Sequence, residues 1–418
     1  MSGSPRSALL RLPARALRGL VRLATSGNAV VVIVLAFLSS LIVGALIIIP
    51  ATPSALSAWG DVGSDPLNAI VQSLDAVGNA YGSLLAGAVG SPGGYVQALD
   101  LRPADVVSAF SPLSETLVST TFYLVAGLGI ALAFRAGLFN IGGQGQLIAG
   151  AIFATWAGFE FPGLPIYLHL PLAILCGAMG GAVVGFIPGL LKAWTGAHEV
   201  ITSMMLNYVV LSLLTWVVTT RLFQAPPRNE AISKVIAPSA QLPHLAGPDL
   251  RVNLGIVLAV LAAIGVAWLL RHSTLGFKFR MVGLNPFAAR VAGAGMQRLT
   301  VIAMTLSGLL VGLAGAFMVL GVDLQIAPNY GGTYGFDAIT VAILGRGSPT
   351  GVVLASLLFG AFEAGGRSMQ ASTGIPLQLV EVLQAVIVLF VAAPGVIRTI
   401  YRIRVARTGE RVFGGWGA

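Results

Sequence analysis

Long apolar runs separated by short polar segments dominate this chain. The run from Ala29 to Ile49 contains no charged residue, and a helix of that length reaches about 30 Å, the thickness of one bilayer core. Other predominantly apolar runs cover residues 113–134, 146–159, 168–191, 200–219, 253–270, 299–321, 336–344, 352–362 and 376–397. The pattern predicts an all-α fold, a polytopic transmembrane helix bundle of about ten spans.

Three apolar stretches depart from a full span. Residues 336–344 and 352–362 are short and are interrupted by Gly and Pro. We expect broken or re-entrant helices there, which survive in lipid only where protein or a cavity covers them. Residues 67–89 also favour a helix, but Asp75, Asn79 and several glycines break the run, so we do not count it as a span.

Composition supports a membrane protein. Only 9% of the residues are charged and 56% are hydrophobic, with a mean hydropathy of +0.88, whereas a soluble protein has about 25% charged residues. The net charge of +9 does not indicate a nucleic-acid partner, because the cations fall in loops that we expect on the cytoplasmic side. The single cysteine, Cys176, permits no internal disulfide and no cysteine-based metal site.

Charge divides the chain into segments. Residues 1–28 hold five arginines and no acid and predict a cytoplasmic basic N-terminus before the first transmembrane helix at 29–49. Residues 50–112 contain five Asp against one Arg and predict an extracytoplasmic segment. The membrane core then covers 113–397, and a basic tail at 398–418 is expected in the cytoplasm. Ten crossings would place loops 192–198, 271–298 and 345–349 in the cytoplasm as well.

Polar side chains inside the apolar body are candidates for a solute pathway, because burying them in lipid is costly. Asn140, Gln144 and Gln146 lie in a glycine-rich join between two spans. Asn207 follows Glu199 and Ser203 at four-residue spacing, which places the three on one helix face. Gln378, Glu381 and Gln384 form a stripe at three-residue spacing. From these we select Asn140, Gln144, Gln146, Asn207, Glu381 and Gln384 as pathway residues; a packing or capping role is the alternative.

The segment 271–298 is a polar, basic island between two apolar runs. It carries Arg271, His272, Lys278, Arg280, Arg290 and Arg298, and no acid. Asn285 and Pro286 are typical of a helix start, and Gly293 of a helix end. The pattern predicts a short helix at the membrane surface that docks a partner; an ordinary loop held inside by its cations is the alternative.

The chain contains no phosphate-binding loop of the G-x-x-x-x-G-K-[ST] type, no H-E-x-x-H and no G-x-S-x-G. We therefore predict no catalytic residue and no metal site. If the chain transports a solute against a gradient, the energy must come from another subunit.

Residues 133–142, 196–208, the basic island and 336–346 together resemble the permease subunits of bacterial ABC importers, in the branch that includes nucleoside permeases and has simple-sugar permeases as relatives. The resemblance implies a second permease subunit, separate ATPase subunits that bind ATP and Mg, and an extracytoplasmic solute-binding protein, often a lipoprotein. This chain would bind no cofactor itself. It also implies that the short helix in the island couples the bundle to the ATPase. The residues implied are Gly283, Asn285, Pro286, Ala288, Ala289, Arg290 and Gly293.

The expected function is that of a non-enzymatic permease subunit in the cell membrane, with both termini cytoplasmic, that carries nucleosides. The few charges inside the membrane suit a neutral polar solute. A simple-sugar permease is the first alternative. A stand-alone secondary transporter or channel is the second, and a membrane-embedded enzyme is a weaker third.

Overall fold

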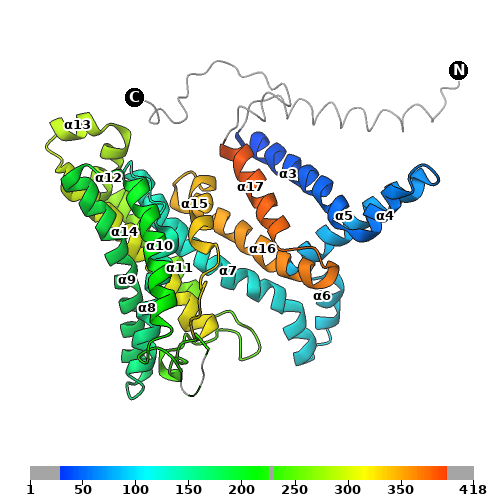
Figure 1. The fold of residues 1–418 in the computed structure, drawn as a ribbon, viewed down its shortest axis with the longest axis horizontal. Coiled ribbons are helices and arrows are strands. Elements are labelled where there is room, and N and C mark those ends of the chain that lie inside the picture. Colours follow the sequence, from blue (N-terminus) through cyan, green and yellow to red (C-terminus); the bar gives the residue numbers. More distant parts are fainter. Residues whose placement is uncertain (1–28, 226, 228–229, 393–418) are drawn as a thin grey trace, which may run out of the picture. The chain divides into compact units, whose positions relative to one another are not determined.

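The computed structural model describes residues 29–225, 227 and 230–392 (Figure 1). Within these ranges the regular structure is helical, apart from two isolated bridges that pair Gln224 with Ser233 and His244 with Asn253. The predicted all-α class is confirmed. The chain divides into two compact units. One contains Met1–Ala80 and Ile375–Ala418, and the other is Tyr81–Gly374.

In the first unit, α3 (Ala29–Ala51) packs against α17 (Gln378–Ala392). α3 is followed at once by α4 (Pro53–Gly60), and the two helices are bent by 75°. Pro53 explains the break, because it has no N–H to continue the hydrogen-bond ladder of α3 but is well suited to begin a new helix. The predicted cytoplasmic N-terminus and the basic tail lie outside the described residues.

The predicted helix near 67–89 is present as α5 (Pro66–Val89), which begins in the first unit and ends in the second. The second unit is otherwise a bundle of long apolar helices joined by shorter elements. The long helices are α7 (Pro103–Arg135), α8 (Gly143–Glu160), α9 (Ile166–Thr195), α10 (Glu199–Val217), α11 (Gly255–His272), α14 (Met296–Met318) and α16 (Pro349–Thr373). The shorter elements are α6 (Pro92–Ala98), η1 (Pro238–Ala240), α12 (Thr274–Leu284), α13 (Pro286–Val291), η2 (Val319–Asp323) and α15 (Tyr334–Leu344).

Small residues allow α8, α9 and α14 to pack with their backbones in contact. A Cβ added to Gly181 of α9 would collide with the carbonyl oxygen of Gly308 in α14, and one added to Gly150 of α8 would collide with Gly312. Close backbone approach of this kind is what drives helix association in lipid, where apolar side chains gain little by leaving the solvent. The closest contacts among these three helices therefore depend on glycine.

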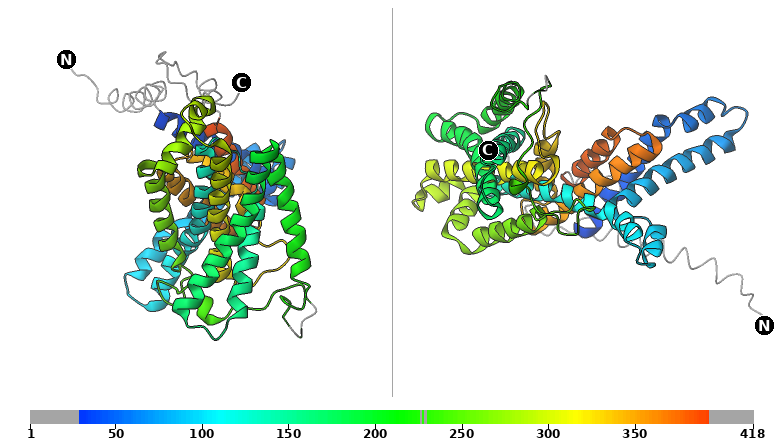
Figure 2. Two further views of the ribbon diagram at one scale, coloured as in Figure 1. Left: turned by 90° about the vertical axis from the view of Figure 1, so that its left-hand side faces the viewer. Right: turned by 90° about the horizontal axis from the view of Figure 1, so that it is seen from below.

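The loops of the second unit gather at two ends. The end formed by residues 192–199, 271–298 and 345–349, which we call the basic end, holds α12 and α13 (Figures 1 and 2). Arg135, the last residue of α7, reaches the same end, because its Nε donates to the Gly347 carbonyl oxygen at 2.7 Å. At the opposite end, the Ile236 N–H donates to the Leu324 carbonyl oxygen at 3.0 Å. The three loops that we expected on one side of the membrane do lie at one end.

Six described helices are long and apolar enough to cross a bilayer, or up to seven if the bent pair of α3 and α4 is one span. The chain is thus a multi-pass membrane protein, but ten spans are not confirmed. Of the shorter apolar helices, α15 matches the short element predicted at 336–344 and α17 matches the start of the one predicted at 376–397.

Residues 352–362 are not a short, broken element, and this prediction was wrong. They belong to α16, which is continuous for 25 residues. Glu363, which directly follows the apolar run, does not end the helix. It is one helical turn from Arg367 and pairs with it at 2.9 Å. Gly360 is not a break either, because it packs against Thr116 and Thr120 of α7.

Candidate functional site

The non-helical segment Ala136–Gly142 lies between α7 and α8 and is held by buried amides. Asn140 is fully buried. Its Nδ2 donates to Gln146 Oε1 at 2.9 Å and to Ser307 Oγ at 2.8 Å, and its Oδ1 accepts from the Gly142 N–H at 2.9 Å. Buried backbone outside a helix needs hydrogen-bond partners from elsewhere in the protein. Here the Asn140 side chain, which is itself held by Ser307 of α14, supplies the partner of the Gly142 N–H.

Asn207 of α10 holds the next part of the same segment. Its Nδ2 donates to the Ile141 carbonyl oxygen at 2.9 Å, and its Oδ1 accepts from the Gly145 N–H at 2.8 Å. Gly145 is in the first turn of α8, where backbone N–H groups have no intrahelical acceptor. Asn207 therefore caps α8 from a different helix.

Gln144 links the first turn of α8 to the start of α15. Its Nε2 donates to the Gly332 carbonyl oxygen at 2.8 Å, and its Oε1 accepts from the Gly335 N–H at 3.0 Å. The sequence predicted that this helix begins at Gln146 and left Gln144 in the join before it, but α8 begins at Gly143, so both lie in its first turn. The structure thus brings Asn140, Gln144, Gln146 and Asn207 together around the starts of two helices.

Glu199 also braces this region. The predicted polar face of α10 is confirmed, because Glu199, Ser203 and Asn207 are all buried. One carboxylate oxygen of Glu199 pairs with Lys192, and the other accepts from the Phe139 N–H at 3.5 Å. The two remaining predicted pathway residues lie elsewhere. Glu381 is exposed and Gln384 is buried on α17, in the other compact unit.

An aromatic and polar cluster follows directly after the Gln144 contact, and the sequence analysis missed it. Tyr334, the first residue of α15, packs against Phe122 and Tyr123 of α7, with ring centroids 5.8 and 4.9 Å apart. Its hydroxyl accepts from Arg367 at 2.7 Å. The Tyr123 hydroxyl donates to Asp337 at 3.3 Å. The only local signal was the four-residue spacing of Glu363 and Arg367; the aromatic partners are about two hundred residues away in sequence.

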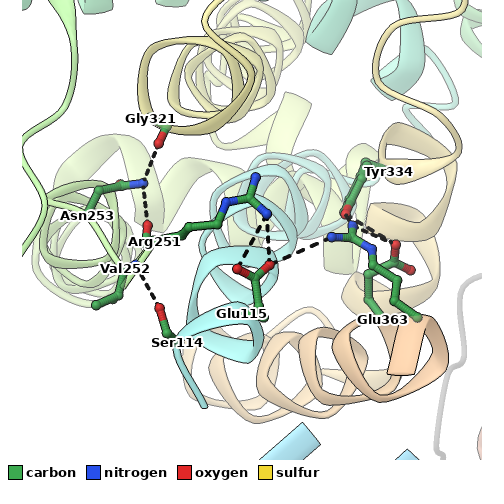
Figure 3. A network of polar contacts seen from close by, with 9 residues as sticks. Ser114, Glu115, Arg251, Val252, Asn253, Gly321, Tyr334 and Glu363 are labelled. Atoms are coloured by element: carbon green, nitrogen blue, oxygen red, sulfur yellow. Dashed lines mark hydrogen bonds and ion pairs between the residues drawn. The ribbon is translucent and has the colours of Figure 1, made fainter. Parts of the chain in front are cut away.

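A charged network extends this cluster toward the opposite end (Figure 3). Glu115 of α7 pairs with Arg251 at 3.2 Å and lies 3.9 Å from Arg367. Beside it, Asn253 Nδ2 donates to the Gly321 carbonyl oxygen at 3.0 Å. The segment before α11 is thereby tied to both α7 and η2.

The short helix predicted in the basic island is confirmed as α13. Asn285 Oδ1 accepts from the Ala288 N–H at 3.0 Å, and Pro286 is the first helical residue. Gly293 has φ +80°, a left-handed conformation that suits glycine after a helix. Ala289 is buried, whereas Phe287 and Val291 are 79% and 90% exposed. The helix therefore presents apolar side chains outward. The sequence did not predict α12, which precedes it.

Gly283, near the end of α12, lies against the end of α7, where the non-helical segment Ala136–Gly142 begins. A Cβ added there would collide with the Arg135 carbonyl oxygen at the end of α7. Arg135 in turn holds Gly347. A backbone contact therefore leads from α12 and α13 to the junction of α7 with residues 136–142. The remaining predicted coupling residues Ala288 and Arg290 are exposed on α13.

Comparison with known proteins assigns this architecture to a family. The family model described as the branched-chain amino acid transport system / permease component matches residues 113–392. A guanosine ABC transporter permease of Bacillus subtilis is 39% identical over 287 residues, which are 68% of this chain and 82% of that protein. The chain belongs to this permease family.

Two further relatives differ in their named solute. A nucleoside ABC transporter permease of Lactococcus lactis is 34% identical over 68% of this chain and 80% of its own length. A glucose ABC transporter permease of Haloferax volcanii is 34% identical over 70% of this chain and 79% of its own length. No solved structure matches the chain.

Proposed function

We propose that this chain is the transmembrane permease subunit of an ATP-driven importer of nucleosides. The relatives named for guanosine and nucleosides support this solute class. The structural observation that carries the proposal is the meeting of α8 and α15 at Gln144, next to the tyrosines of α7 and α15. Helix starts that meet inside a membrane bundle are typical positions of solute sites in transporters.

The chemistry of this region suits a nucleoside. A base is flat and would stack on Tyr334, whose buried ring an outward opening of the bundle would uncover, and its edge and the ribose hydroxyls need hydrogen-bond partners. Asp337 offers an acceptor in the same region, and Gln144 would exchange its bonds to Gly332 and Gly335 for bonds to the solute. Asn140, Gln146 and Asn207 then act as positioning residues, because their amides are already engaged in holding residues 136–142 and the start of α8.

We propose further that α13 docks on an ATPase subunit that binds ATP and Mg. The exposed Phe287 and Val291 would enter a groove of that partner. A second permease subunit and an extracytoplasmic solute-binding protein would complete the importer. The basic end would face the cytoplasm, in agreement with the preference of Lys and Arg for cytoplasmic loops.

A glucose permease is the second candidate, because one relative at 34% identity carries that name. A sugar offers hydroxyls but no flat ring for the tyrosines. Substituting Tyr334 with Leu should therefore weaken uptake of a nucleoside by tenfold or more, at about 1–3 kcal/mol per stacked base, and should affect glucose uptake less.

Uptake by the assembled importer tests both candidates. Cells or proteoliposomes that contain the full complex would be supplied with labelled guanosine, uridine or glucose. We expect ATP-dependent accumulation of the nucleosides, abolished when the partner ATPase is inactivated. Accumulation of glucose alone would reject the nucleoside assignment. Gradient-driven flux through this chain without any ATPase would reject the importer.

A further inference from the structure

A groove at the basic end shares Arg290 and Gly293 with the proposed coupling segment, but its other lining residues have no role in the proposed transport cycle. It lies between α12, the turn that follows α13 and the first turns of α14, and has a volume of about 760 Å³. Its lining includes three cationic side chains, Lys278, Arg290 and Arg298. The described residues that line it include no Asp or Glu.

The three cations have no carboxylate partner among the described residues. The ion pairs in that part of the chain involve Lys192, His198, Arg251 and Arg367. Lys278 and Arg298 are exposed, and their side chains come from different helices. Concentrating three unneutralised cations around one concave surface is unfavourable unless an anion joins them.

The first turn of α14 adds to the positive potential. Gly295 stands at its N-cap, and no side chain caps the helix. The backbone N–H groups of this turn have no intrahelical acceptor and favour a nearby anion. Because Gly295 to Arg298 line the groove, these groups support the same ligand charge as the side chains.

One wall of the groove is apolar. Leu275, Leu299 and Ile302 contribute to the lining, and Ile302 is 39% exposed. A small soluble anion would leave this wall in water. A ligand with an anionic head and a hydrocarbon body would cover both parts, and the groove lies at the ends of membrane-spanning helices, where such molecules are abundant.

We propose that this groove binds an anionic phospholipid. The headgroup phosphate lies among Lys278, Arg290 and Arg298 at the first turn of α14, and the glycerol and upper acyl chain lie along Leu275, Leu299 and Ile302. Basic pockets between helices at a membrane surface are suited to lipid phosphates. The site is separate from the solute path and from the exposed apolar face of α13.

Native mass spectrometry on the purified full chain tests the proposal. The protein is titrated with phosphatidylglycerol or with phosphatidylcholine of the same acyl chains. The Lys278→Gln/Arg298→Gln variant removes two groove cations and spares α13. The Arg271→Gln/Arg346→Gln variant is the matched control, because it removes the same charge from the same end but outside the groove.

We expect wild type to bind phosphatidylglycerol at least about tenfold more tightly than phosphatidylcholine, the groove variant to lose about thirtyfold for its two cations, and the control to stay within about twofold of wild type. The comparison of lipids on wild type decides the matter even if the groove variant fails to fold. Equal binding of both lipids, or equal losses in the two variants, would overturn the proposal.

Two further arms separate the lipid from other anions. Inorganic phosphate should not displace phosphatidylglycerol; displacement would identify a site for a soluble anion. Adding the partner ATPase should leave the bound lipid in place. Release of the lipid by the ATPase, together with loss of ATPase binding in the groove variant, would show that the groove docks a protein instead.

Discussion

Asn140 and Asn285 perform the same local task in opposite surroundings. Each accepts a backbone N–H shortly after itself, Asn140 from Gly142 and Asn285 from Ala288. Asn140 is fully buried and binds two more side chains from α8 and α14. Asn285 is exposed, and the α13 helix that it caps displays Phe287 and Val291.

The difference separates two kinds of polar turn in one bundle. The segment 136–142 has its hydrogen-bonding capacity used internally, so its sequence is explained by the structure of this chain. α13 has its capacity only partly used, and the ATPase contact that we propose for it would explain its exposed apolar side chains. Substitutions in residues 136–142 should lower the stability of the fold. Substitutions in α13 should reduce transport and leave the fold intact.

The largest effect is expected from removing α13. Replacing Asn285–Gly293 with a Gly/Ser linker of equal length should reduce ATP-driven uptake to background, because the bundle loses its contact with the ATPase. The thermal unfolding midpoint of the purified variant should stay close to that of wild type. As a control, Phe287→Leu keeps an apolar side chain and should retain most uptake. Undiminished accumulation with the linker would remove the basis for a coupling role.

The next effect is expected from Asn140→Ala. Gln146, Ser307 and the Gly142 N–H would each lose a buried partner, at about 1–3 kcal/mol for a group left unsatisfied. We expect a total destabilisation of about 2–4 kcal/mol, since part of the network can rearrange. Asn285→Ala is the matched control and should cost about 1 kcal/mol, the usual value for an exposed cap. Equal shifts in the two thermal midpoints would contradict the distinction.

The smallest effect is expected from Glu199→Gln. The amide keeps an oxygen for the Phe139 N–H but loses the charge that pairs with Lys192, whose side chain is 33% exposed. Glu199 is buried, but the Lys192 end of the pair is in contact with solvent and is screened, so we expect the pair to contribute about 1 kcal/mol. A double-mutant cycle with Lys192→Met, followed by thermal unfolding, isolates this contribution. A coupling energy well above that size would show that the Glu199–Lys192 pair is needed to hold residues 136–142 in place.

The sequence predicted elements whose signals are local. α13 was anticipated because Asn285, Pro286 and Gly293 act within a few residues of themselves. Most of the long helices were predicted from the length of their apolar runs. The full length of α16 was not predicted, because its continuity depends on the Glu363–Arg367 pair and on contact with α7.

The candidate site was predicted only in part, for a similar reason. Asn140, Gln144, Gln146 and Asn207 were found as polar residues in apolar surroundings. Their partners could not be found that way, since Ser307 is 167 residues from Asn140 and Gly335 is 191 residues from Gln144. The tyrosine cluster was missed because nothing near Tyr123 in sequence indicates that Tyr334 faces it. Contacts of this kind are set by tertiary packing.

The glycine contacts between α9 and α14 limit how the bundle can rearrange. Where Gly181 meets Gly308, the carbonyl oxygen of each residue faces the α-carbon of the other with no side chain between them, so no rotamer change can absorb sliding. We therefore expect the two helices to move together. Because α14 begins just after α13, a force on that short helix would act on both at once and, through the contact of Gly312 with Gly150, on α8.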